Sequence, residues 1–300
     1  MRVAITGSTG LIGTAVRKAL LARGHEVTRV VRSLSSIPPG ERAVVWHPDT
    51  GEIEAAGLEG HEVVIHLAGE SIAGVWTPAK KARILESRKR GTALISKTIA
   101  SLEKKPAALL ASSGIGIYGD RDPAEELTEA SAAGTGFLAD VGRVWEANTA
   151  PAAAAGIRVV NMRTANVLTP AGGMLATLLP VFRLGFGAPF GTGTQVWSWI
   201  TLEDMVAAIF HVLEHERLHG PVNFAAPGAV SNEAFTRILA AAVHRPTVFR
   251  IPAFATRLAP GGMGEEILLG GARVVPRALL DSGFAFAWPE LKPALLVMLK

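Results

Sequence analysis

The chain has 300 residues, of which 49% are hydrophobic and 19% are charged, with a net charge of +4 and no cysteine. This composition excludes an intrinsically disordered chain, a disulfide-stabilised scaffold and a thiolate metal site, and it suits a reducing compartment. No apolar run reaches roughly 18 residues, and the first residues resemble no signal peptide, so we expect no membrane span and a cytoplasmic location.

Strands and helices alternate through the first half of the chain. Short apolar runs predict strands at 2–6, 26–31, 43–46, 62–68, 107–112 and 157–163. Helical periodicity predicts helices at 11–24, at about 78–103 and at 136–150, where Pro151 ends or kinks the last of them. This alternation predicts an α/β fold, a Rossmann-type doubly wound parallel sheet with helices on both faces.

The pattern changes after Arg163. Residues 169–198 are rich in glycine and proline, Thr201 and Asp204 form a capping box, and a strand is predicted at 221–227. We therefore expect a nucleotide-binding domain over residues 1–165 and a smaller α+β C-terminal substrate lobe over 166–300. Part of 201–227 is expected to return to the first domain.

The densest basic run is KKARILESRKR at residues 80–90. Apolar residues interrupt it at helical spacing, which predicts a helix with a solvated basic face. No aromatic residues are interleaved as a stacking platform, so we expect no nucleic-acid partner.

A glycine-rich turn joins the first predicted strand to the first predicted helix. Its glycines have the spacing G-x-x-G-x-x-G, which permits close approach of a pyrophosphate to the backbone and to the helix N-terminus. The residues predicted to bind the cofactor here are Gly7, Ser8, Thr9, Gly10, Leu11, Ile12 and Gly13.

The end of the second predicted strand indicates which nicotinamide cofactor is used. Folds that prefer NAD place an aspartate or glutamate there for the ribose 2′-hydroxyl. This chain has Arg32 and Ser33 instead. A guanidinium and a hydroxyl suit a 2′-phosphate, so we expect NADP(H).

Further motifs resemble one family along the whole chain. These are ITGSTGLIG, VVIHLAGESI, SRKRGT, ASSGIGIYGD, FLADVGRVWE, GTGTQVWSWITLEDMV and the tail RVVPRALLDSGFAFAWPEL. Together they resemble the epimerase-family branch of the atypical short-chain dehydrogenases/reductases, which carries its own small C-terminal domain. The resemblance implies bound NADP(H), an unassigned substrate, and contacts to the nicotinamide ribose from Leu67, Ala68, Gly69 and Glu70.

The wider superfamily uses a Tyr-x-x-x-Lys dyad in which the tyrosine transfers a proton and the lysine lowers its pKa and holds the ribose. Aligning Glu146 with the glutamate that commonly follows this motif puts Leu138 and Gly142 at the two places. The only tyrosine in the chain is Tyr118, and the residue four positions after it is Asp122. We therefore expect the dyad to be absent.

Two other residues are candidate catalytic groups. Ser113 follows the fifth strand, where a hydroxyl can bind a carbonyl oxygen, and Tyr118 lies just beyond it. Tyr118 is either a displaced acid or a structural tyrosine. Histidines at 211, 215 and 219 lack a completing carboxylate, so no metal site is predicted.

Two functions remain open from the sequence. The first is an NADP(H)-dependent oxidoreductase or epimerase-like enzyme that acts on an unidentified small molecule without the usual dyad. The alternative is a non-catalytic NADP(H)-binding sensor or regulatory protein. We expect either a monomer or a homodimer.

Overall fold

An eight-stranded sheet runs through the molecule in the order β12-β8-β6-β5-β1-β2-β3-β4. Neighbouring strands pair in parallel, except for the β3–β4 pair at one edge. The strands are β1 (Arg2–Thr6), β2 (Glu26–Val31), β3 (Arg42–His47), β4 (Glu52–Ile53), β5 (Val63–His66), β6 (Ala108–Gly114), β8 (Arg158–Thr164) and β12 (Gly220–Phe224). The computed structural model describes residues 1–258 and 260–300, and it confirms the predicted Rossmann-type sheet.

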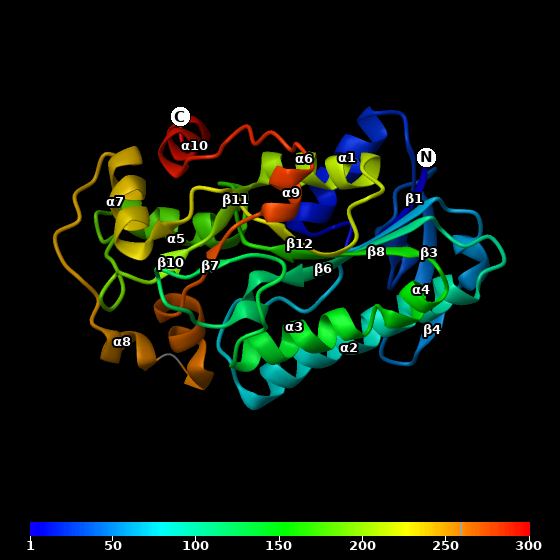
Figure 1. The fold of residues 1–300 in the computed structure, drawn as a ribbon, viewed down its shortest axis with the longest axis horizontal. Coiled ribbons are helices and arrows are strands. Elements are labelled where there is room, and N and C mark those ends of the chain that lie inside the picture. The colour runs from blue at the N-terminus through cyan, green and yellow to red at the C-terminus, as the bar shows by residue number, and fades with distance from the viewer. Residues whose placement is uncertain (259) are drawn as a thin grey trace.

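Helices cover both faces of this sheet (Figure 1). One face carries α1 (Leu11–Ala22), α6 (Leu202–Glu214) and α9 (Arg277–Asp281); the other carries α2 (Pro78–Ser101), α3 (Phe137–Ala147) and α4 (Ala150–Ala154). Every residue of β5 is buried, as expected for a parallel strand between two helical layers. Within the described ranges, no helix is both long and apolar enough to cross a membrane.

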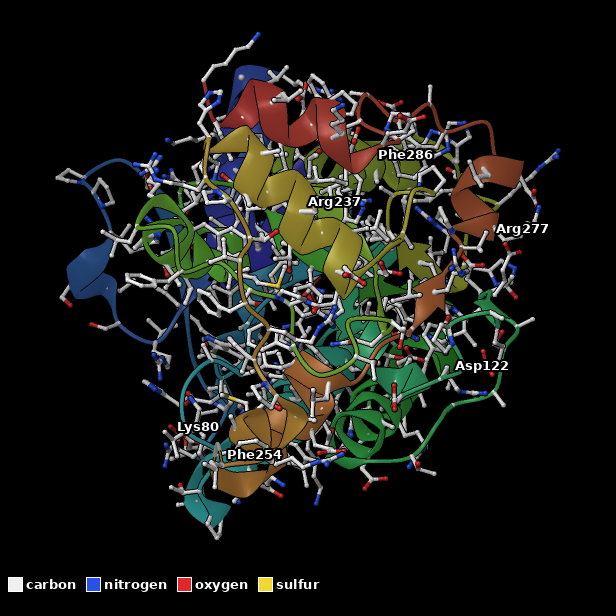
Figure 2. All side chains as sticks on the ribbon, turned by 90° about the vertical axis from the view of Figure 1, so that its left-hand side faces the viewer. Lys80, Asp122, Arg237, Phe254, Arg277 and Phe286 are labelled. Atoms are coloured by element: carbon white, nitrogen blue, oxygen red, sulfur yellow. The ribbon has the colours of Figure 1, made fainter. Side chains whose placement is uncertain are left out.

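A smaller lobe of helices and short strand pairs lies at one end of the sheet (Figure 1). Its helices are α5 (Gly173–Arg183), α7 (Asn232–Ala242), α8 (Ala253–Arg257) and α10 (Leu291–Met298), with a π-helix at Gly264–Leu269. Its strand pairs are β9 (Asn166–Leu168) with β11 (Trp199–Thr201), β10 (Val196–Trp197) with β13 (Val230–Ser231), and β7 (Glu126–Leu127) with β14 (Arg273–Val274). Figure 2 views this lobe end-on, with α7 and α10 side by side.

The chain passes between the two parts more than once. After β9, β10 and β11 of the smaller lobe, α6 packs on α1, and β12 pairs with β8 as the edge strand of the large sheet. Near the C-terminus, β14 pairs with β7 from the first half of the chain. The two parts are therefore joined by packing and by several crossings rather than by one linker.

The structure differs from the sequence prediction at the end of α3 and in the capping of α6. The helix predicted at 136–150 ends at Ala147, and α4 begins at Ala150 with Pro151 in its first turn. At α6, the Thr201 hydroxyl accepts from the Asp204 N–H as predicted. The Asp204 carboxylate, however, accepts from the backbone of Ala287 and Trp288, so it binds the tail instead of completing the capping box.

Buried polar contacts tie β1 to the loop that follows β5. Thr6 Oγ1 accepts from the N–H groups of Leu67 and Ala68, at 3.0 and 3.1 Å, and lies 2.8 Å from His66 Nδ1. Because this oxygen accepts two bonds, its own hydrogen points to Nδ1, and His66 Nε2 then donates to Thr92. This pattern requires a neutral imidazole, and burial lowers the pKa of His66 to about 4.

We expect this histidine to make stability depend on pH in mild acid. An unfolded histidine takes up a proton near pH 6.5, so the unfolded state binds more protons than the folded state between about pH 6.5 and 4. The free energy of unfolding should therefore fall by about 2 to 3 kcal/mol from His66 between pH 7 and pH 4. Urea titrations at several pH values measure this, and His66→Gln should flatten the dependence. An equal dependence in that variant would assign the loss to other groups.

Candidate functional site

The loop between β1 and α1 requires glycine at its two ends. Gly7 has a φ of +65°, and a Cβ added there would lie 2.8 Å from the backbone of Leu67. A Cβ on Gly13 would lie 2.1 Å from the Gly7 carbonyl oxygen, whereas one on Gly10 would lie 3.3 Å from it. The loop therefore packs closely against the backbone of Leu67 and against its own residues. Gly10 is exposed just before α1, whose start has neither a side-chain cap nor an acidic residue in the first turn.

Ser8 has a different environment from the rest of this loop. Its side chain is buried, and its hydroxyl accepts from Arg29 Nε at 3.0 Å. Arg29 also binds Glu41 at 2.8 Å, and Glu41 binds Arg17. The Ser8 side chain thus anchors the loop to β2. The part of Ser8 that can contact a cofactor is therefore its backbone.

Arg32 and Ser33 directly follow β2 and are exposed, on the same edge of the sheet as the glycine loop. The Ser33 hydroxyl accepts from the Ser35 N–H and so caps the short helix that follows. No carboxylate occupies these two positions.

Residues 67–70 connect β5 to the region before α2. The backbone of Leu67 and Ala68 is held by Thr6, and the N–H of Glu70 donates to Ser87. The Glu70 carboxylate binds Lys80 at 2.6 Å, and this hydrogen bond holds the pKa of Glu70 below its ordinary value. Residues 67–70, which are predicted to lie beside the nicotinamide ribose, are therefore held in place by β1 and by α2. The carboxylate of Glu70 is already paired with Lys80.

A cavity of about 230 Å³ lies between the sheet edge, α3 and the smaller lobe. Apolar side chains and glycine backbone form most of its wall, and two of the lining side chains, Arg88 and Glu266, are charged. The residues that line it include Arg88, Gly114, Leu138, Gly142, Trp145, Thr164, Asn166, Trp197 and Glu266.

The predicted dyad positions lie on this cavity. Both Leu138 and Gly142 line it, one helical turn apart on α3. A Cβ on Gly142 would lie 2.8 Å from the Ile117 Cβ, and one on Gly116 would lie 3.0 Å from the Leu138 Cβ. A longer side chain at position 142 would therefore displace Ile117. The close packing around Gly116 and Gly142 thus favours glycine at both positions.

The two predicted catalytic side chains, Ser113 and Tyr118, lie outside the set that lines the cavity. Ser113 is buried and donates to Glu146 at 2.8 Å, while its neighbour Gly114 lines the cavity. Adjacent residues of a strand point to opposite sides, so the hydroxyl faces the interior and the glycine faces the cavity.

Tyr118 is fully buried and its hydroxyl lies between three partners. It accepts from Arg163 at 2.9 Å and lies 2.7 Å from Asn223 Oδ1 and 3.0 Å from the Thr128 carbonyl oxygen. Burial raises the pKa of Tyr118, the opposite of the change that activates a proton-transferring tyrosine. This arrangement argues for a structural tyrosine and against a displaced acid.

The two charged residues of the cavity wall were not among the site residues predicted from the sequence. Arg88 belongs to the basic run that predicted a solvated helix face, but it is only 8% exposed. Its position four residues after buried Ile84 and seven before buried Ile95 places it on the apolar face of α2, and this spacing was the available signal. Glu266 had no local signal, because its partners are distant in the sequence.

Glu266 ties the smaller lobe to the start of α3. Its two carboxylate oxygens accept from the N–H groups of Phe137 and Leu138, at 3.0 and 2.9 Å. A carboxylate at a helix N-terminus is favoured by the unpaired N–H groups and the helix dipole. The π-helix that carries Glu266 thereby forms one wall of the cavity next to the dyad positions.

Comparisons with known proteins cover both parts of the chain. The NAD dependent epimerase/dehydratase family matches residues 3–225, and a domain of unknown function (DUF1731) matches residues 251–296. Epimerase family protein Mb2239 of Mycobacterium bovis is 41% identical over 285 residues, covering 95% of this chain and 93% of that protein.

Two solved structures are similar over this whole chain. The human epimerase family protein SDR39U1, crystallised with NADPH, is 32% identical with a TM-score of 0.87, and 99% of that chain is covered. A nucleoside-diphosphate sugar epimerase from Corynebacterium glutamicum is 34% identical with a TM-score of 0.81, and 58% of that chain is covered.

Proposed function

Because this chain belongs to the NAD dependent epimerase/dehydratase family, we propose that it is an NADP(H)-dependent oxidoreductase or epimerase-like enzyme acting on a small molecule. The observation that carries the proposal is the glycine loop at the exposed start of α1, beside a β2 that is followed by Arg32 and not by an acid. The NADPH in the similar human structure supports the same cofactor.

The cofactor would lie along the carboxyl edge of the sheet. In this arrangement the backbone of 7–13 holds the pyrophosphate, Arg32 and Ser33 hold the 2′-phosphate, and residues 67–70 lie beside the nicotinamide ribose. A nicotinamide supplies hydride transfer when it is bound. The chain's own cavity residues would position the reacting group and exclude water, with apolar walls from Leu138, Trp145 and Trp197.

One observation favours a second candidate, a non-catalytic NADP(H) sensor. The positions aligned with the dyad are Leu138 and Gly142, and neither Ser113 nor Tyr118 lines the cavity. A turnover assay separates the two functions. Reduction by NADPH of any compound in a panel of aldehydes, ketones and nucleotide sugars supports the enzyme, whereas tight NADPH binding without turnover of the panel supports the sensor.

We expect a strong preference for NADPH over NADH. A 2′-phosphate paired with Arg32 adds a charge-assisted hydrogen bond, so NADPH should bind more tightly by roughly 1.5–3 kcal/mol in calorimetry. Arg32→Ala should remove most of this preference and leave NADH binding unchanged. Arg23→Ala is the matched control, since Arg23 is a half-exposed arginine at the far end of α1. Equal affinities for the two cofactors in the wild-type protein would refute the preference.

A further inference from the structure

Arg88 is a buried cation in the wall of the cavity. It lies on α2, is only 8% exposed, and forms no ion pair with any described residue. Burying a charge without a counter-ion costs free energy, and such a group is retained only where something else compensates it. Burial lowers the pKa of Arg88 to about 10, so the guanidinium is still a cation at neutral pH.

Its hydrogen bonds occupy one nitrogen only. Nη1 donates to the carbonyl oxygens of Glu70 and Ile84, at 3.0 and 3.1 Å, and the guanidinium lies 4.5 Å over the Trp145 ring. Nε is enclosed and has no hydrogen-bond partner among the described residues. Nη2 donates to no described residue and is not enclosed in this way, so it is the guanidinium nitrogen that a ligand in the cavity can reach.

Glu70, whose carbonyl oxygen bonds Arg88, and Glu266, which lines the same cavity, both have engaged carboxylates. The Glu70 carboxylate binds Lys80 at 2.6 Å and lies 3.7 Å from Arg83. Neither Lys80 nor Arg83 is among the residues that line the cavity. Glu266, the acid that lines the cavity, accepts from the start of α3. The missing counter-ion of Arg88 is therefore one that the described residues do not provide.

Two tryptophans line the cavity with Arg88. The indole N–H groups of Trp145 and Trp197 are buried without partners among the described residues. The two indole N–H groups are enclosed, so Arg88 is the cationic donor that the cavity wall presents, among mostly apolar side chains. A ligand with an anionic acceptor group and a small apolar body suits this wall.

We propose that Arg88 binds the carboxylate of the substrate through its Nη2 atom, and that the substrate is a small organic acid. A carboxylate oxygen accepts a charge-assisted hydrogen bond from this cationic nitrogen. The proposal rests on the proposed function, because the cavity is the substrate site only if the cofactor lies beside residues 67–70. The cofactor's pyrophosphate has its own place at the glycine loop, so the anion at Arg88 comes from the substrate.

The test compares carboxylates with their neutral amides on the NADP⁺-saturated protein. The probes are acetate and acetamide, isobutyrate and isobutyramide, and benzoate and benzamide, measured by saturation-transfer NMR and calorimetry. In at least one pair the wild-type protein should bind the carboxylate about tenfold or more tightly, which is the effect of a charge-assisted bond. Arg88→Gln should lose this preference, and Arg88→Lys, which keeps the buried charge but not the planar guanidinium, should retain only part of it.

Arg90→Gln is the matched control, because Arg90 is a half-exposed arginine two residues away on the same helix. It should keep the full preference for carboxylates. No preference in any pair, or an unchanged preference in Arg88→Gln, would overturn the proposal. A tenfold loss of NADPH affinity in Arg88→Gln would also overturn it, since the anion would then belong to the cofactor. Failure of the proposed function is distinguishable, because the wild-type protein would then not bind NADPH.

Discussion

Replacing Glu146 with leucine is expected to lower the free energy of unfolding by about 3–5 kcal/mol. Glu146 on α3 forms a bidentate ion pair with Arg163 on β8, at 2.8 and 2.9 Å, and accepts a hydrogen bond from Ser113 on β6. The side chains of the pair are only 15% and 10% exposed. Removing the carboxylate therefore leaves a buried guanidinium without its counter-ion, which costs more than the pair itself contributes.

The control for this variant lies on the same helix. Asp140 pairs with Arg143, but their side chains are 65% and 44% exposed, so Asp140→Asn should cost less than about 1 kcal/mol. Adding Arg163→Met to Glu146→Leu should recover much of the stability, since no unpaired charge is then buried. Urea unfolding of the three proteins measures these differences. A loss below 1 kcal/mol in Glu146→Leu would show that water reaches the pair.

The same ion pair explains why the predicted catalytic residues are structural. Ser113 lies near the end of β6 and Tyr118 follows that strand, where the wider superfamily places reactive hydroxyls, and their sequence positions resemble that pattern. The structure uses both hydroxyls to complete the buried network around Glu146 and Arg163. The predicted strand ended at residue 112, whereas β6 continues to Gly114. The direction in which Ser113 faces depends on a shift of one residue, which a single sequence does not resolve.

The parts of the fold that depend on local patterning were predictable. The bounds of β1 and β2 agree with their apolar runs, and α2 begins at Pro78 with Thr77 as its cap, near the predicted start. The glycine loop was predictable because Gly7 needs a positive φ and Gly13 needs close packing, two requirements that no other residue type meets.

The cavity was not predictable in the same way, because contacts between distant segments form it. Glu266 reaches Leu138 across 128 residues, and no local pattern marks that pairing. Arg88 had a helical signal, but the basic residues around it favoured a solvated interpretation. Burial of one arginine among exposed ones follows from how α2 packs on α3, which is a tertiary property.

Gly10→Val is expected to abolish NADPH binding, with a loss of at least about 1,000-fold, or about 4 kcal/mol, while the protein remains folded. Gly10 has a φ of −71° and a ψ of 172°, an extended conformation that valine adopts readily. The position is exposed at the start of α1, where the proposed pyrophosphate must approach the backbone. The added methyl groups would therefore occupy the space of the ligand without disturbing the core.

The neighbouring glycines make this test specific. Gly13→Ala should instead unfold the loop, because its Cβ would lie 2.1 Å from the Gly7 carbonyl oxygen, whereas Gly10→Ala has 3.3 Å and should retain the fold with partly weakened binding. Thermal melting distinguishes folded from unfolded variants, and calorimetry with NADPH measures the affinity of those that fold. If a folded Gly10→Val protein bound NADPH as tightly as the wild type, the glycine loop would be an ordinary turn, and the cofactor would have to bind elsewhere.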